Sequence, residues 1–201
     1  MMTDILIVAT NNEAKFREIR QIAEEYGILA RMPAVKTDVQ EGVVSYEENA
    51  LLKASSATAQ SGVDALGEDS GIEIAALGGF PGVISARFVE GSDQDRNNAL
   101  LERMKTIEPA RRLAVFKACV VISLVNGGHL TGYGELRGRI TEVPEGGNGF
   151  GYDPIFIPDG FDRTLGLLDV EEKNRISHRR KAIESAVRQY RDYKNTVKKQ
   201  G

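Results

Sequence analysis

The chain has 201 residues, of which 41% are hydrophobic and 27% charged, a balance typical of one globular domain that buries a core, with or without two lobes. The formal net charge of -3 excludes a generally basic surface that coats nucleic acid, although a local basic pocket is compatible with it. A single cysteine, Cys119, excludes an internal disulfide, and its apolar neighbours favour a buried thiol in a reducing cytoplasm.

The N-terminal residues predict neither a signal peptide nor a membrane anchor. Residues 1–4 contain an acid and no basic residue, whereas a signal peptide begins with basic residues. Every apolar run is far shorter than the ~20 residues that a membrane-spanning helix needs. We therefore expect no membrane partner.

The first predicted elements form a strand–turn–helix–strand unit. Residues 5–9 are a continuous apolar run, which predicts a buried parallel strand, and residues 10–12 form a polar turn. Apolar residues then recur at spacings of three and four over residues 16–26, which predicts an amphipathic helix. Gly27 ends that helix, and residues 28–35 predict a second strand. This order indicates an α/β fold.

The middle of the chain predicts a helix and then a glycine-bounded turn. Ser45 and Glu48 fit a capping box for a helix that ends near Gly62. A short apolar stretch follows, and residues 67–71 then read as a tight acidic turn before the strand-like residues 72–74.

The second half of the chain predicts two more helices and a hairpin. Residues 96–107 are amphipathic, and residues 113–125 and 130–136 are strand-like runs joined by a turn over residues 126–129. Part of the sheet is therefore antiparallel. A last helix is predicted from Ser177 to about Val197. Repeats and low-complexity linkers are absent from the sequence, so we expect a single domain over residues 1–201.

The first candidate site follows the first predicted strand. At a strand-to-helix turn, free backbone N–H groups and the positive end of the helix dipole suit an anion. Thr10 and Asn12 can donate hydrogen bonds and Lys15 adds a positive charge, a combination that suits phosphate. Asn12 as a plain helix cap, with Lys15 as a solvated surface residue, is an equally good interpretation of this segment alone.

The second candidate site is the acidic turn. Glu68 and Asp69 are adjacent carboxylates, and in a tight turn they would repel each other unless a divalent cation or a proton relieved the repulsion. Glu41, in another loop, could complete a site for a hard cation. Taken alone, the segment is better interpreted as an exposed acidic turn.

The third candidate site is the glycine-rich segment 146–154. Its glycines allow a ligand to approach the backbone, Phe150 and Tyr152 offer stacking faces, and Asp153 can accept from ring N–H groups. A glycine-rich loop without a ligand is the competing interpretation.

The fourth candidate site is the charged segment 171–180. His178 and Arg179 would lie in the first turn of the last helix, where the dipole disfavours cations. That placement suggests compensation by an anion or by a ring acceptor such as a purine oxygen. A solvated charge run with an ordinary cap is the alternative.

Together, these segments resemble the Ham1-like inosine/xanthosine triphosphate pyrophosphatases nearly from end to end. The motifs that carry the resemblance are the loop from Thr10 to Lys15, Glu48-Asn49-Ala50 through Lys53, Glu68-Asp69-Ser70-Gly71, Leu77-Gly78-Gly79-Phe80-Pro81-Gly82, Ser85-Ala86-Arg87, Phe150-Gly151-Tyr152-Asp153-Pro154 and Ser177-His178-Arg179. The resemblance implies an elongated mixed sheet flanked by helices, with two lobes around a nucleotide cleft, in a homodimer.

The resemblance also implies the reaction and the residues that perform it. The enzyme would convert non-standard purine triphosphates (ITP, dITP, XTP) to the monophosphate and pyrophosphate, with Asp69 as the catalytic acid/base and Glu41 and Asp69 holding Mg²⁺. The implied substrate-binding residues are Thr10, Asn11, Asn12, Glu13, Ala14, Lys15, Lys53, Ser70, Arg87, Phe150, Gly151, Tyr152, Asp153, Lys173, His178 and Arg179.

Within that set, the loop of residues 10–15 and Lys53 would hold the triphosphate, and Phe150 would stack on the base. Asp153, His178 and Arg179 would read the base edge. The sequence departs from many relatives at Glu68, where they carry aspartate, and at Leu167, where they carry glutamate. The alternatives are a sensor that binds a triphosphate without cleaving it and a Maf-type pyrophosphatase for modified pyrimidines.

Overall fold

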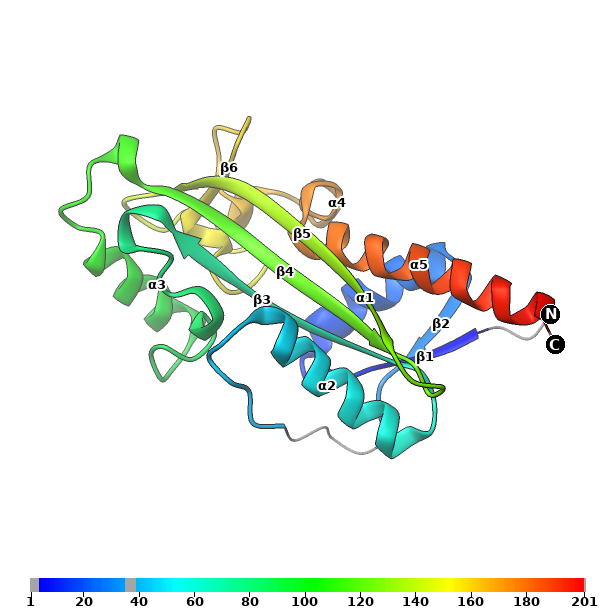
Figure 1. Cartoon of the computed structure of the whole chain (residues 1–201). Coiled ribbons are helices and arrows are strands. Elements are labelled where there is room, and N and C mark those ends of the chain that lie inside the picture. Colours follow the sequence, from blue (N-terminus) through cyan, green and yellow to red (C-terminus); the bar gives the residue numbers. More distant parts are fainter. Residues whose placement is uncertain (1–3, 35–38, 201) are drawn as a thin grey trace. The chain divides into compact units, whose positions relative to one another are not determined.

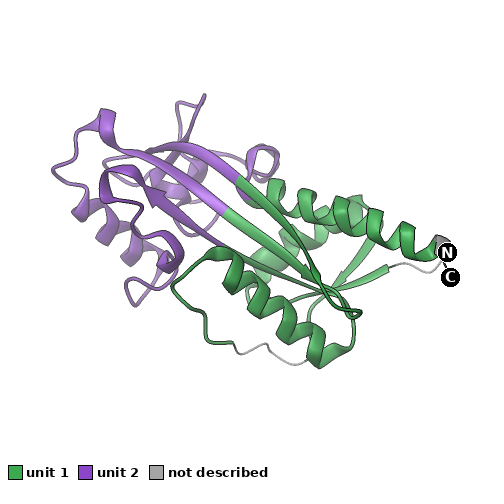
Figure 2. Ribbon diagram, in the orientation of Figure 1, with its two compact units in different colours: residues 1–69, 118–134, 179–201 green, residues 70–117, 135–178 purple. Residues whose placement is uncertain are grey.

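The computed structural model describes residues 4–34 and 39–200. These residues form two compact units, coloured separately in Figure 2. Unit 1 comprises residues 1–69, 118–134 and 179–201, and unit 2 comprises residues 70–117 and 135–178. The predicted end of the second strand, Val35, lies outside the described residues. The single domain over residues 1–201 stays a prediction.

The strands form one mixed sheet (Figure 1). In sheet order they are β2 (Ile28–Arg31), β1 (Asp4–Val8), β3 (Ala65–Ile74), β4 (Leu113–Ser123), β5 (His129–Ile140) and β6 (Phe156–Pro158). β1 pairs in parallel with β2 and β3, and β5 pairs in antiparallel with β6. The predicted α/β class with a mixed sheet is therefore confirmed.

The α-helices of the described residues vary in length and are capped by the sequence around them. They are α1 (Glu13–Glu25), α2 (Tyr46–Ser61), α3 (Asp93–Arg103), α4 (Val170–Ile176) and α5 (His178–Gln200). The Asn12 side chain caps α1, and the Ser45 side chain caps α2 by accepting from the Glu48 amide at 3.1 Å. α2 ends at Gly62, as predicted, and Gly62 has the left-handed conformation. Among the described residues, no helix is both long and apolar enough to span a bilayer.

In unit 1, helices cover both faces of the sheet. α1 and α5 pack on the face that carries Val120 and Ile122 of β4. α2 packs through small alanines on the other face, which carries Cys119 and Val121. Because side chains alternate along a strand, successive residues of β4 serve two different helical layers. The predicted burial of Cys119 is confirmed.

In unit 2, one face of the strands carries a separate core. Ile72 and Ile74 of β3 pack with Phe116 of β4 and Phe156 of β6, together with Leu100 of α3. Leu136 and Ile140 of β5 also belong to this core, and exposed and buried residues alternate along β5 from Glu135 to Ile140. Unit 2 therefore has the pattern of a sheet that is buried on one face and solvated on the other.

Several predicted boundaries were wrong by a few residues. The helix predicted over residues 96–107 is α3, which begins earlier because Ser92 and Asp95 form a capping box. α3 also ends earlier, at Arg103. Just beyond its last turn, the Arg112 guanidinium donates a hydrogen bond to the Met104 carbonyl at 2.9 Å. β4 ends at Ser123, β5 continues to Ile140, and α5 reaches Gln200.

The predicted acidic turn over residues 67–71 was also wrong, because β3 runs through it without interruption. Gly67 and Gly71, which bound the segment, are not among the glycines with positive φ. A Cβ on Gly67 would lie 2.1 Å from the Ala50 carbonyl oxygen of α2 and 2.8 Å from the Ala54 amide. Gly67 is therefore required for the close approach of α2 to the strand and not for a turn.

We predict that Gly67→Ala lowers the free energy of unfolding by about 3 kcal/mol or more, because the added methyl would overlap helix backbone that cannot move independently. Urea unfolding followed by circular dichroism measures the change. Gly147→Ala is the matched control, since a Cβ there has nothing within 4 Å. Equal stability of the two variants would contradict the close-packing role of Gly67.

Candidate active site

The alternation of side chains along β3 separates the two neighbouring acids. Glu68 points to the face covered by α1 and α5, and Asp69 points to the face covered by α2, as their partners show. Both are almost fully buried, so the exposed acidic turn is excluded. The mutual repulsion that the sequence suggested is weakened because the carboxylates enter different environments.

Glu68 is the centre of a buried ionic network in unit 1. Its Oε2 lies 2.8 Å from Lys15 Nζ and its Oε1 lies 3.1 Å from Arg179 Nε. The other side of the guanidinium binds Glu18, with Arg179 Nη1 2.8 Å from Glu18 Oε2. Burial alone would raise the pKa of Glu68, but Lys15 and Arg179 outweigh it and hold that pKa well below its ordinary value.

Asp69 meets a different set of groups on the α2 face. Its Oδ2 accepts from Asn49 Nδ2 at 2.9 Å, and its Oδ1 lies 3.5 Å from Lys53 Nζ. The same Nζ lies 2.7 Å from Glu41 Oε1. Burial raises the pKa of Asp69 in spite of the opposing charge of Lys53. The structure thus brings together the two predicted metal ligands, Glu41 and Asp69, around one lysine.

Asn49 links the Glu41 loop to Asp69 and was missed among the predicted site residues. Its Oδ1 accepts from the Gly42 amide at 2.8 Å, and its Nδ2 donates to the Gly42 carbonyl at 3.2 Å as well as to Asp69. The signal in the sequence was a polar residue inside the buried stripe of α2, beside Ala50. Such a residue needs polar partners.

Residues 10–15 form the capped start of α1. Asn12 Oδ1 accepts from the amides of Ala14 at 2.9 Å and Lys15 at 3.1 Å, and Thr10 Oγ1 accepts from the Asn12 amide at 3.1 Å. The interpretation of Asn12 as a helix cap is confirmed. The interpretation of Lys15 as a solvated residue was wrong, because its side chain is directed to Glu68. Asn11 and Glu13 are exposed.

Unit 2 brings together a second group of predicted residues. Lys173 Nζ lies 2.5 Å from Asp153 Oδ2 and 4.4 Å from the centre of the Phe150 ring. The Phe150 amide donates to the same Asp153 oxygen at 2.8 Å. Asp153 therefore fixes the loop backbone and the lysine together, and the lysine lies over one face of the aromatic ring.

The expectation that Tyr152 offers a stacking face was wrong. Its ring lies in the unit 2 core, and its hydroxyl donates to the Ser85 carbonyl at 2.6 Å. Burial raises the pKa of Tyr152 beyond its ordinary range. Asp153 is held by its polar contacts and Tyr152 by the packing of its ring, so these two consecutive residues of the loop have different roles. Gly151 is half-buried and donates its amide to Asp93.

The remaining predicted residues have mixed exposure. His178 is buried and its ring stacks on Phe116, with centroids 4.8 Å apart. Ser70 is half-buried in β3, and Arg87 is exposed. Because His178 and Arg179 are both buried, the alternative of a solvated charge run at the start of α5 was wrong.

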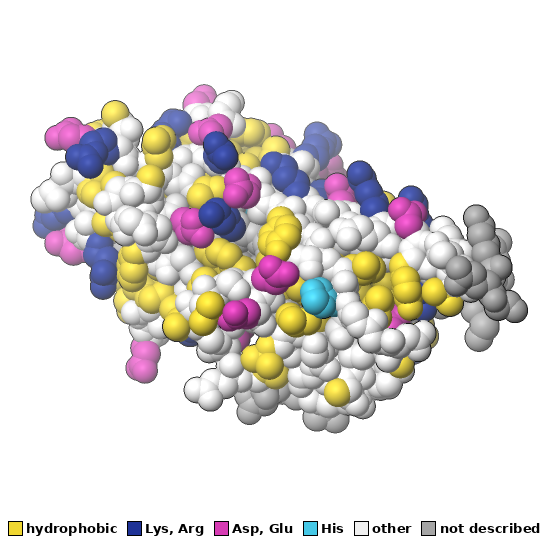
Figure 3. Space-filling view, viewed as in Figure 1, with side chains coloured by type: hydrophobic (Ala, Val, Ile, Leu, Met, Phe, Trp, Pro, Cys, Tyr) yellow, Lys and Arg dark blue, Asp and Glu magenta, His cyan; other side chains and the backbone are white. Residues whose placement is uncertain are grey.

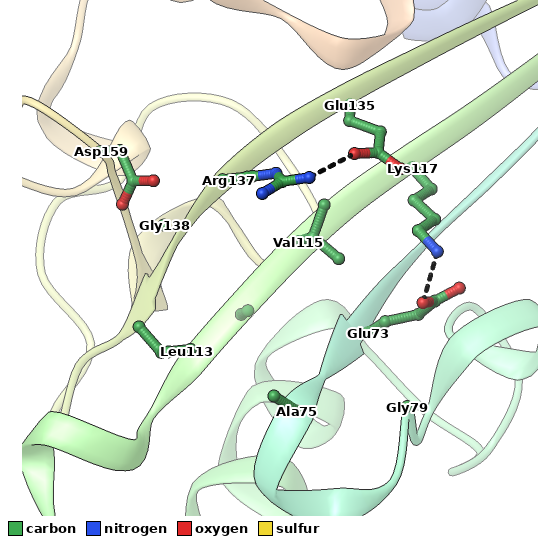
Figure 4. Close-up of a pocket in the computed structure, with 11 residues that line it drawn as sticks. Glu73, Ala75, Gly79, Leu113, Val115, Lys117, Glu135, Arg137, Gly138 and Asp159 are labelled. Carbon is green, nitrogen blue, oxygen red and sulfur yellow. Dashed lines mark ion pairs between the residues drawn. The ribbon is translucent and has the colours of Figure 1, made fainter.

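The solvated sheet face of unit 2 carries an open pocket of about 540 Å³ (Figure 4). Lys117 of β4 pairs with Glu73 of the neighbouring β3 at 2.7 Å, and Arg137 lies 3.6 Å from Glu135, two residues earlier on β5. Acidic and basic side chains lie side by side on the surface seen in Figure 3. None of the predicted site residues lines this pocket, so it is separate from the candidate active site.

The acids of unit 1 suit a cation with few protein ligands. Over residues 4–34 and 39–200, no three His, Cys, Asp or Glu side chains converge as a complete metal cage. Glu41 and Asp69, which share Lys53, form a pair of hard oxygen donors. Mg²⁺ commonly takes one or two protein carboxylates and completes its shell with water and substrate phosphate. The donor pair therefore fits such an ion.

Comparison with known proteins identifies the family. The Ham1 family model matches residues 6–189. A dITP/XTP pyrophosphatase of Symbiobacterium thermophilum is 46% identical over 89% of this chain and 90% of its own length. A dITP/XTP pyrophosphatase of Aquifex aeolicus is 40% identical over 90% of this chain and 94% of its own length. This chain belongs to the Ham1 family, which confirms the resemblance seen in its motifs.

Solved structures support the same assignment. A HAM1 protein from Coxiella burnetii has a TM-score of 0.82 at 33% identity, covering 96% of this chain and 99% of that one. A nucleoside-triphosphatase (dITP/XTP pyrophosphatase) from Mycobacterium abscessus has a TM-score of 0.73 at 34% identity, covering 87% and 93%. The fold is therefore that of the family along nearly the whole chain.

We predict that Glu68→Gln lowers the free energy of unfolding at pH 7 by about 3 kcal/mol, since Lys15 and Arg179 would lose a buried counter-charge. The folded-state pKa lies below the ordinary value of 4.5. The Glu68 charge therefore makes its full contribution to the free energy of unfolding above about pH 4.5. This contribution is lost as the pH falls towards the folded-state pKa.

Chemical denaturation of both proteins between pH 7 and pH 3.5 measures this difference. The difference in free energy of unfolding between wild type and Glu68→Gln should become smaller below about pH 4.5. Glu24→Gln is the control, because its pair with Arg20 is exposed and should contribute less than about 0.5 kcal/mol at either pH. A difference in free energy of unfolding that stays constant with pH would contradict the ionic role of Glu68.

Proposed function

We propose that this chain is a divalent-metal-dependent nucleoside-triphosphate pyrophosphohydrolase. It converts ITP, dITP and XTP to the corresponding monophosphate and pyrophosphate, and so removes non-standard purines from the nucleotide pool. The observation that carries the proposal is the buried Asp69 carboxylate, held by Asn49 and Lys53 beside Glu41. The relatives that are named dITP/XTP pyrophosphatases support this substrate class.

Mg²⁺ is the cation we propose, held by Glu41 and Asp69. When bound, the ion supplies positive charge to the phosphate oxygens and supports water attack on phosphorus. The fit rests on the hard oxygen donors and on the Lys53 ammonium, which already places a positive charge between them. The homodimer and the cytoplasmic location are further proposals, supported by the family resemblance and by the single buried Cys119.

Asp69 acts on the attacking water. A water oxygen forms a bond to the α-phosphorus as the bond to the α–β bridging oxygen breaks, and pyrophosphate leaves in line with the attack. Asp69 orients the water and accepts its proton at a carboxylate oxygen. The raised pKa of Asp69 makes the carboxylate a stronger base than an exposed aspartate. Asn49 holds the other oxygen, so the orientation of the carboxylate is fixed.

The lysines and the α1 loop hold the triphosphate. Lys53 and Lys15 carry positive charge to the phosphates, and the start of α1 adds its dipole. Ser70, the residue after Asp69 on the same strand, contacts the nucleotide. Arg87, which is exposed, adds charge near the phosphates.

The base is held by residues of the glycine-rich loop and of the start of α5. Phe150 stacks on the purine, and Asp153 and Lys173 fix the loop that carries it. His178 and Arg179 donate to the 6-oxo group. An adenine amine at that position would leave buried donors unpaired, at a cost of about 1–3 kcal/mol for each group.

The proposal predicts the products of a triphosphate panel. With Mg²⁺, ITP, dITP and XTP should each give the monophosphate and one pyrophosphate, while ATP should react at least about tenfold more slowly in kcat/KM. Anion-exchange chromatography separates the products. Stepwise release of orthophosphate would show a phosphatase instead, and preferred cleavage of modified pyrimidine triphosphates would favour the Maf-type alternative.

Asp69→Asn should reduce kcat by about 10³-fold or more, because the amide cannot accept the proton and binds the cation weakly. Single-turnover assays and circular dichroism measure activity and folding. Glu73→Gln is the matched control on the same strand: its partner is Lys117 on the solvated face, so its activity should stay within about twofold of wild type. An Asp69→Asn enzyme with substantial turnover would remove Asp69 from the catalytic role.

A further inference from the structure

Lys53 lies where a cation is expected. Its Nζ is 2.7 Å from Glu41 Oε1 and 3.5 Å from Asp69 Oδ1, and its side chain is only 12% exposed. We infer that the Lys53 ammonium takes the place of the divalent ion between these carboxylates when no metal is bound, and that metal binding displaces it. Lys53 would then be a competitor of the metal as well as a phosphate ligand.

The electrostatics of the α2 face support this exchange. Neighbouring carboxylates repel each other, and a positive charge between them offsets the repulsion. The Lys53 ammonium contacts both Glu41 and Asp69, and the Asp69 side chain is only 8% exposed. The ammonium therefore stabilises the pair of acids. A divalent ion can perform the same task with twice the charge.

The helix supplies the geometry for an exchange. Lys53 lies one turn of α2 after Asn49, so both residues project towards the same side. Asn49 holds Asp69 and the backbone next to Glu41. The acids therefore stay in place if the lysine leaves. The long flexible stem of Lys53 allows its ammonium to move without a change in the helix.

Lys15 provides the contrast within the same unit. Its ammonium binds Glu68 on the other face of β3, and Glu68 is also held by Arg179. Lys15 therefore neutralises a carboxylate that is not one of the proposed metal ligands. Removal of this lysine should therefore leave the metal site unchanged.

The exchange has a functional consequence, which rests on the proposed function. A metal ion that binds without nucleotide must displace the Lys53 ammonium from the two carboxylates. No phosphate is then present for the ammonium to bind. A metal that arrives with a triphosphate brings the anion as well, so Lys53 passes from the carboxylates to a phosphate. The enzyme therefore binds the metal ion weakly without nucleotide and strongly with it.

The test measures Mn²⁺ binding without nucleotide, by the loss of the free-ion signal in electron paramagnetic resonance. Lys53→Met should bind Mn²⁺ at least about tenfold more tightly than wild type, because a positive charge a few ångströms from the ion is removed. Lys15→Met should bind within about twofold of wild type. Adding Asp69→Asn to Lys53→Met should abolish the gain, which locates the ion.

Unchanged or weaker Mn²⁺ binding by Lys53→Met would overturn the inference, and so would an equal gain in Lys15→Met. Lys53→Gln, which keeps a polar side chain, repeats the test if the methionine variant folds poorly, and circular dichroism reports the folding. This readout uses no turnover. A protein that binds Mn²⁺ as expected but fails to hydrolyse ITP would contradict the proposed function and leave the lysine exchange supported.

Discussion

Side chains of consecutive residues in a β-strand point to opposite faces of the sheet, and the organisation of the candidate site depends on this constraint at Glu68 and Asp69. One carboxylate enters the layer of α1 and α5, where Lys15 and Arg179 bind it. The other enters the layer of α2. Two adjacent acids can therefore have separate tasks, because the strand backbone holds them apart and both faces of the sheet are covered by helices.

The two faces differ in how much charge they leave available for chemistry. On the Glu68 face, cations and anions neutralise one another in a buried network that includes Glu18, and such a network holds β3, α1 and α5 together. On the Asp69 face, two acids share one lysine, and the pKa of Asp69 is raised. The first arrangement neutralises Glu68 and orients Lys15 and Arg179, the proposed nucleotide ligands, whereas the second is suited to bind a metal and to accept a proton.

Much of the fold and the family followed from the sequence because those signals are local. Apolar spacing of three and four gave α1, the Ser45 cap and Gly62 gave both ends of α2, and the motifs gave the family before any geometry was known. The acids of the site were also identified as residue types. Their separation onto two faces of the sheet was not predicted, since residues 67–71 were predicted as a turn and are part of β3.

The errors have physical causes. Glycines beside polar residues are typical of turns, but Gly67 is required by the close approach of α2, a tertiary contact. Tyr152 was read as a stacking face because its loop is glycine-rich, whereas the unit 2 core takes up its ring. Asn49 was overlooked as a site residue because an asparagine in a helix has no single meaning until its partners are known. Each case depends on residues distant in sequence.

The central claim is that the metal and the chemistry belong to the Asp69 face of β3 and the structural network to the Glu68 face. Crystals soaked with Mn²⁺ and a non-hydrolysable dITP analogue test it most directly, because anomalous scattering locates the ion. We expect the peak within about 2.5 Å of an Asp69 carboxylate oxygen, with Glu41 as a second or water-bridged ligand. A peak coordinated by Glu68, with Asp69 remote from the ion, would contradict the account.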